Sequence, residues 1–198
     1  MKRGIFGLAV LGLLFSFSAA QAGTISVTAG GRPTAPNESG PGKAPVGSFM
    51  HTFFVTTDSD ILSISNVSFT AAGQLYQNVL GSDVEPPNAA FVAVFPELGV
   101  DSWISTPGGT SSAGGGFSGD DASWFDTDPS GPVAGFQFAT LTLPAGVIGT
   151  FKGNINTVGP GGQSVDAFAF SIVIPEPTSL GLAGFGMLAA LVARRRNA

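Results

Sequence analysis

One stretch of the sequence combines residue types and spacing that suit metal binding. In DTDPSG, Asp126, Asp128 and Ser130 place oxygen ligands at relative positions one, three and five, and Gly131 occupies position six. A calcium loop of the helix–loop–helix type begins in this way. Position twelve is Gln137 rather than a bidentate glutamate, and a strand is expected to follow the loop. These two departures exclude a helical calcium-binding hand.

Two interpretations of this acidic loop remain open. In the first, Asp120 or Asp121 completes a looser surface Ca²⁺ site, since hard oxygen ligands on turns suit calcium. In the second, Pro129 and Gly131 simply close an acidic turn. We favour the ordinary turn and keep calcium as the one cofactor that the sequence suggests. The absence of cysteine and the single histidine argue against zinc or copper.

Residues with catalytic potential are few. His51 is the only histidine, and its apolar neighbours Met50 and Phe53 favour a structural position in a strand over a role as general base. Segment 116–119, GFSG, lacks the G-x-S-x-G spacing of a nucleophile elbow. The glycines of 159–162 are not followed by the Gly-Lys-Ser/Thr of a phosphate loop. We therefore predict no catalytic residues and no enzyme activity.

The elements that must position these residues are strands. β-Branched and aromatic residues dominate seven stretches and two shorter pieces around Trp103 and Trp124. The seven stretches are 24–28, 48–57, 61–69, 90–95, 133–143, 147–155 and 164–174. Turns rich in glycine and proline separate them. This pattern predicts an all-β domain, a β-sandwich or jelly roll of roughly seven to nine strands.

The phase of the apolar residues adds detail to this prediction. Both faces of 164–174 are apolar, which predicts a central strand. Within 61–69 and within 133–143 the apolar positions slip by one residue, which predicts a β-bulge in each. The stretches 30–45 and 106–123 are rich in glycine, proline and small polar residues, and they are predicted to be long loops.

The charge of the domain restricts its partners. Three basic and twelve acidic residues lie between Gly23 and Ile174, which gives a net charge of −9. Such a surface repels phosphate groups, so nucleic acid is excluded as a partner and anionic lipid is a poor one. The absence of cysteine removes disulfides, zinc–thiolate sites and thiol catalysis together.

The C-terminal sequence VIPEPTSLGLAGFGMLAALVARRRNA predicts a membrane segment. Residues 180–193 are all apolar or glycine, and as a helix they would reach about 21 Å, short of the ~30 Å hydrocarbon core. Snorkelling of Arg194, Arg195 and Arg196 makes a short transmembrane helix feasible. The same arginines orient the helix with its C-terminus in the cytoplasm.

The N-terminal sequence has the parts of a signal peptide. Two basic residues precede the apolar run 5–17, and Ala20 and Ala22 frame a cleavage site before Gly23. The chain is therefore predicted to be exported after cleavage by signal peptidase. The predicted organisation is a signal peptide with its helix at 1–22, an extracellular domain at 23–174 and a tail at 175–198.

The tail as a whole resembles a known sorting signal. Pro175, Glu176 and Pro177, followed by the short apolar helix and the arginine cluster, resemble the PEP-CTERM signal of Gram-negative bacteria. The resemblance implies that an exosortase recognises the precursor in the inner membrane and removes the tail. It further implies a final location at the cell surface or outside the cell, in association with exopolysaccharide or biofilm production.

Three functions fit the domain itself. We prefer a non-enzymatic surface or matrix protein. The first alternative is a carbohydrate-binding module that binds extracellular polysaccharide, with Trp103, Trp124, Phe125 or Tyr76 as its stacking platform. The second is a secreted enzyme of the glycoside hydrolase type, whose carboxylate pair would come from the aspartates within 120–128.

Overall fold

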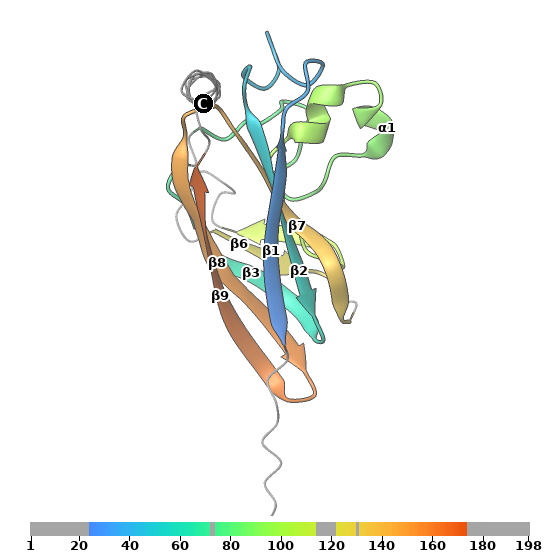
Figure 1. The fold of residues 1–198 in the computed structure, drawn as a ribbon. Coiled ribbons are helices and arrows are strands. Elements are labelled where there is room, and N and C mark those ends of the chain that lie inside the picture. The colour runs from blue at the N-terminus through green and yellow to red at the C-terminus, as the bar shows by residue number, and fades with distance from the viewer. Residues whose placement is uncertain (1–23, 72–73, 114–121, 130, 174–198) are drawn as a thin grey trace, which may run out of the picture.

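The computed structural model describes residues 24–71, 74–113, 122–129 and 131–173. Within these ranges the regular secondary structure is mostly β-strand, with the short α-helix α1 and the short 3-10 helix η2 (Figure 1). In chain order the elements are β1 (Ile25–Pro33), β2 (Phe49–Thr57), β3 (Asp60–Phe69), α1 (Ala89–Val92), the 3-10 helix η2 (Pro96–Val100), β4 (Trp103–Ile104), β5 (Thr110–Ala113), β6 (Ala122–Asp126), β7 (Val133–Leu143), β8 (Ile148–Gly159) and β9 (Gly162–Val173).

The strands form two antiparallel sheets that face each other. The first sheet has the order β1-β2-β7-β4, and the second has the order β5-β6-β3-β8-β9. Aromatic rings from the two sheets meet between them. The ring centroid of Phe53 on β2 lies 4.7 Å from that of Phe151 on β8, and Phe138 on β7 lies 5.5 Å from Phe168 on β9. The prediction of an all-β domain of about seven to nine strands is confirmed.

Both predicted β-bulges are present. In β3 the pairing register shifts between Ile64 and Val67, and Asn66 has a φ of 51°, a left-handed conformation that asparagine tolerates better than most residues. In β7 the pairing partners of β2 step past Phe138, which is fully buried. The slips in the apolar pattern therefore mark positions where the strand turns a second side chain toward the core.

The predicted strand at 90–95 is wrong. Residues Ala89–Val92 form α1 instead, and the Asn88 side chain caps this helix by accepting a hydrogen bond from the N–H of Ala90 at 2.8 Å. No residue of α1 is buried. The phenylalanine and valines of this segment have a strand-like composition. Neither sheet provides a strand for the segment to pair with, and the Asn88 cap stabilises a helical turn instead.

The predicted central position of the last strand is also wrong. β9 lies at the edge of its sheet and pairs with β8 through a tight turn at Pro160 and Gly161. Phe168 and Ile172 face the core, whereas Val165 and its neighbouring alanines on the other face are exposed. The outer face is apolar in composition but consists mostly of small side chains, which cost little when they remain in water.

The two predicted long loops are shorter than expected. β1 continues through Gly30 and Gly31 to Pro33, since Gly31 packs so closely on β2 that a Cβ would lie 2.5 Å from the carbonyl oxygen of Met50. Proline is tolerated there because β1 is an edge strand. In the second loop, 110–113 forms β5 beside β6, and 114–121 lie outside the described residues.

Candidate functional site

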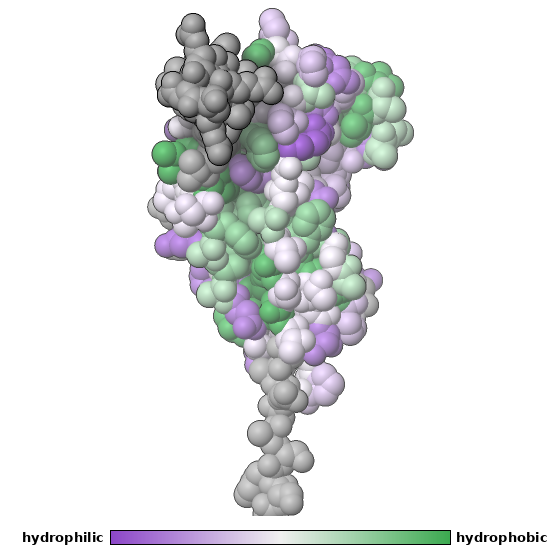
Figure 2. All heavy atoms as spheres, in the orientation of Figure 1, coloured by the Kyte–Doolittle hydropathy of each residue, from purple (hydrophilic) through white to green (hydrophobic). Residues whose placement is uncertain are grey.

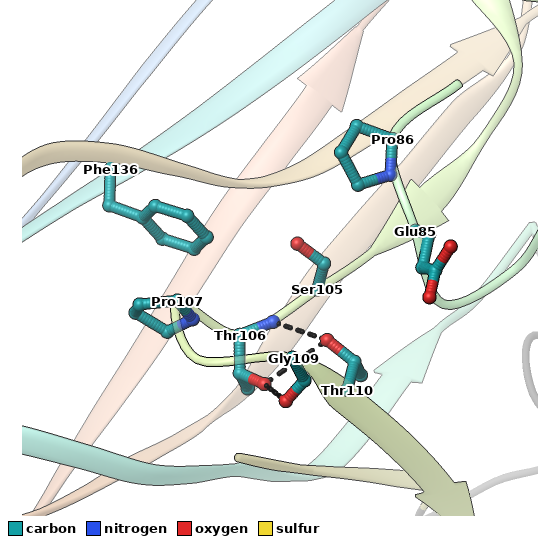
Figure 3. Close-up of a pocket in the computed structure, with 8 residues that line it drawn as sticks. All are labelled: Glu85, Pro86, Ser105, Thr106, Pro107, Gly109, Thr110 and Phe136. Carbon is teal, nitrogen blue, oxygen red and sulfur yellow. Dashed lines mark hydrogen bonds between the residues drawn. The ribbon is translucent and has the colours of Figure 1, made fainter. Parts of the chain in front are cut away.

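A pocket of about 330 Å³ opens between the segment that precedes α1, the turn after β4 and strand β7 (Figure 3). Its lining combines one carboxylate, three hydroxyl side chains and one aromatic ring with prolines and a glycine. The lining residues are Glu85, Pro86, Ser105, Thr106, Pro107, Gly109, Thr110 and Phe136. Figure 3 shows the ring of Phe136 on one side and Glu85 with Pro86 on the other. A concave site with an aromatic wall and a few polar groups is typical of small-ligand binding.

The threonines of the pocket build the turn that carries them. The N–H of Thr106 donates to Oγ1 of Thr110 at 2.8 Å, and Oγ1 of Thr106 donates to the carbonyl of Gly109 at 2.9 Å. Thr106 itself is buried. Both hydroxyls are therefore engaged within the turn. Among the lining residues, Glu85 is the one with an ionisable side chain.

Asp126 ties this turn to the end of β6. Its Oδ2 accepts a hydrogen bond from the N–H of Gly108 at 3.1 Å, and its Oδ1 accepts one from the N–H of Asp128 at 3.0 Å. The N–H of Thr127 donates to the carbonyl of Gly109 at 3.0 Å. Both oxygens of Asp126 therefore satisfy backbone donors, which is the structural role that aspartate commonly has in turns.

The structure describes only part of the predicted calcium set. Asp126 and Asp128 are described, whereas Asp120, Asp121 and Ser130 lie outside the described residues. Among the residues that are described, no three acidic, histidine or cysteine side chains come close enough to hold a metal ion. The contacts of Asp126 agree with an ordinary acidic turn, and the calcium site stays a prediction.

A buried carboxyl group that sequence reasoning missed lies at Asp101, between η2 and β4. Its side chain is almost fully buried, and its Oδ1 accepts a hydrogen bond from the N–H of Asn78 at 2.7 Å. Burial raises the pKa of Asp101 to about 6, although the N–H of Asn78 opposes this by stabilising the charged form. Its Oδ2 packs against Gly81, where a Cβ would not fit. Asp101 thus pins the irregular segment around residue 78 to the sheets.

His51 occupies a structural position, as the sequence suggested. It lies on β2 opposite Leu141 of β7, with its ring centroid 4.8 Å from that of Phe49. Burial lowers its pKa, and none of the described residues forms a hydrogen bond with its buried Nε2. This environment favours a neutral imidazole inside the sheet.

The tryptophans proposed as a carbohydrate-stacking platform are core residues. Trp103 and Trp124 are 6% and 0% exposed, and the indole N–H of Trp124 donates to the carbonyl of Asp83 at 3.3 Å. A sugar ring cannot reach either indole face, so these two residues do not form the platform. Tyr76 is half-buried and hydrogen-bonded to Asn78, while Phe125 is exposed.

The residues predicted for export and sorting lie outside the described part of the chain. They are Ala20, Ala22 and Gly23 at the signal-peptide site, Pro175, Glu176 and Pro177 in the sorting motif, and Arg194, Arg195 and Arg196 at the end of the tail. The predicted signal and transmembrane helices at 1–22 and 175–198 lie there as well. Across the described ranges, no helix has the length and apolar character needed to cross a membrane.

Comparison with known families identifies the tail. Residues 173–196 match the PEP-CTERM protein-sorting motif. The match begins at the last residue of β9. No curated protein and no solved structure gives a significant match to the chain.

Proposed function

We propose that this chain, which carries a PEP-CTERM sorting motif, is a non-enzymatic protein displayed at the cell surface or released into the extracellular matrix. The motif implies an exported, exosortase-targeted protein whose precursor is anchored in the membrane. One observation carries the proposal: the motif starts where β9 ends. Cleavage near Pro175–Pro177 would remove the tail and leave every described strand in the released protein.

A role without catalysis is supported by the placement of the ionisable groups. Glu85 is the only carboxylate in the pocket, Asp101 is buried between η2 and β4, and His51 lies within a sheet. General acid–base chemistry on a glycoside needs two carboxyl groups at a fixed separation around the scissile bond. A structural or adhesive role in exopolysaccharide or biofilm makes no such demand.

The arginine cluster offers a direct test of the sorting route. The three residues Arg194–Arg196 should hold the short apolar segment in the correct orientation for the exosortase. Replacing all three with serine should cause uncleaved precursor to accumulate in a host that contains exosortase, measured by immunoblot of membrane and extracellular fractions. Replacing all three with lysine keeps the charge and should preserve processing. Equal processing of the two variants would contradict the proposed role of the arginines.

A further inference from the structure

The end of the domain from which the sorting tail departs can be located from strand pairing. Val173, the last residue of β9, pairs with Ile148 at the start of β8, and Phe49 at the start of β2 pairs with Leu143 at the end of β7. Both pairs lie at the end of the domain where β9 finishes, and we call this end of the domain the tail end. In Figure 1 the end of β9 and helix α1 lie at the same end of the molecule, opposite the hairpin that joins β8 to β9.

Exposed apolar side chains gather at the tail end. Seven of the nine large exposed hydrophobic residues in the described ranges lie on the loops, on α1 or at the strand start found there. They are Val46, Val79, Leu80, Phe91, Val94, Phe95 and Ile148. Val79 is 98% exposed and Val94 is 68% exposed. Figure 2 shows hydrophobic residues clustered over α1. Apolar surface concentrated in one region of a soluble domain usually marks an interaction site.

Unpaired acidic side chains, in contrast, are concentrated away from the tail end. At the tail end, Arg32 binds Glu38 through two hydrogen bonds of 2.7 and 2.6 Å, and Lys43 lies 3.2 Å from Glu97. These ion pairs neutralise four of the charged groups there, whereas Asp101, which is buried against Gly81, forms no ion pair within the described residues. Asp58, Asp60, Asp126, Asp128 and Asp166, which form no ion pair within the described part of the chain, lie on strands and turns nearer the opposite end. The tail end therefore carries less net negative charge than the opposite end of the domain.

Chain length keeps this surface close to the bilayer. Only residues 174–179 separate Val173 from the apolar run that starts at Leu180. Six extended residues span at most about 20 Å. While the tail is anchored, the tail end cannot move further than this from the membrane, whereas the hairpin at Pro160 lies a full strand length away.

We propose that the apolar residues of the tail end bind the surface of the lipid bilayer in the anchored precursor and orient the domain with its acidic end away from the membrane. This inference rests on the membrane anchoring described under the proposed function. Phenylalanine and valine side chains on short loops and on a single helical turn insert into the boundary between headgroups and acyl chains, where apolar burial stabilises the contact. Removal of the tail leaves only this weak contact, so the processed domain can leave the membrane.

Single labelled cysteines test the proposal, because the natural chain contains no cysteine. Val79→Cys and Val94→Cys place a fluorophore at the tail end, and Val165→Cys places one on exposed β9 near the opposite hairpin. The full chain is reconstituted in phosphatidylcholine vesicles with and without bromine on the acyl chains. Bromolipid should roughly halve the emission at positions 79 and 94 and leave position 165 nearly unchanged.

The outcomes separate the anchor from the surface contact. If the chain floats with the vesicles but bromolipid quenches all three positions equally, or none of them, the tail anchors the protein and the lipid-facing surface is refuted. If positions 79 and 94 show energy transfer between labelled copies but no quenching by lipid, the surface binds a second copy and the proposal is also refuted. A chain that fails to float overturns the anchoring and, with it, this inference.

Discussion

Gly108 lies at a close approach between the pocket turn and the acidic loop. An added Cβ would lie 1.7 Å from the carbonyl oxygen of Asp128 and 2.5 Å from Oδ1 of Asp126. Gly108→Ala should therefore lower the free energy of unfolding by about 1–3 kcal/mol, measured by urea denaturation. Gly30→Ala is the matched control, because its nearest contact is the flexible hydroxyl of Thr52 at 3.3 Å. The control should stay within about 0.5 kcal/mol of wild type, and equal effects would contradict the close approach.

Asp101 should give the protein an unusual dependence on pH. Its pKa is about 6 in the folded protein, above the ordinary value of 3.8. Between these values the folded state binds more protons than the unfolded state, so the contribution of Asp101 to stability falls as the pH rises through 6. Asparagine at this position does not titrate. The melting temperature of Asp101→Asn, measured relative to that of wild type, should therefore rise as the pH is raised from about 4 to 7.

Comparison with the variant is needed because other groups titrate in the opposite sense. Burial lowers the pKa of His51, and hydrogen bonds with Arg32 lower the pKa of Glu38. Protonation of either group therefore lowers the stability of the folded protein as the pH falls. These effects are shared by wild type and Asp101→Asn and cancel in the difference. A difference in melting temperature that does not change with pH would refute the raised pKa of Asp101.

The acidic loop makes a separate prediction about calcium. If Asp126 only satisfies the N–H groups of Gly108 and Asp128, Ca²⁺ acts by screening surface charge. Millimolar Ca²⁺ should then raise the melting temperature of wild type and of the double variant Asp126→Asn/Asp128→Asn by the same amount. A rise confined to wild type would instead establish the calcium site that the spacing of the loop suggests.

At the scale of elements, the core is centred on aromatic rings from both sheets. Phe151 is fully buried and lies 4.7 Å from Phe53 and 5.1 Å from Phe168, measured between ring centroids. Phe151→Ala should cost about 3–5 kcal/mol of unfolding free energy in urea denaturation. Phe170→Ala is the control, because its ring is only partly buried on the edge strand β9. A larger cost for Phe170 than for Phe151 would contradict the partial burial of the Phe170 ring.

The positions of most strands could be predicted from local patterns, and the misses share a cause. The bulges in β3 and β7 follow from the phase of apolar residues, because a slip in phase reports directly which side chains face the core. The edge position of β9 could not be found in this way, since alternation reports burial and not which strand lies alongside. α1 was missed because a strand needs a hydrogen-bonded partner, and composition does not show one.

The candidate site was less predictable than the fold. Asp126 was identified from its spacing in the DTDPSG stretch, but its hydrogen bond to Gly108 joins residues 18 positions apart. Asp101 carried no sequence signal at all, because its burial depends on the segment around Asn78 folding over it. The pocket likewise draws Glu85, Thr106 and Phe136 from three separate parts of the chain.

At the scale of the whole molecule, the acidic two-sheet domain ends where the sorting motif starts. Val173 closes β9 and is also the first residue of the matched motif. The proposed cleavage near Pro175–Pro177 would therefore leave the last strand complete and would not require the domain to unfold. The apolar tail end links the two parts, because it is the portion of the domain held nearest the membrane until cleavage.

The central claim is that an exosortase removes the tail and releases an intact β-domain. The most direct test is the intact mass of the protein recovered from the extracellular matrix of a host with exosortase. We predict a C-terminus near Pro175–Pro177, with the full sequence of β9 retained, and loss of this species in a host without exosortase. Recovery of extracellular protein that still ends at Ala198 would contradict the account.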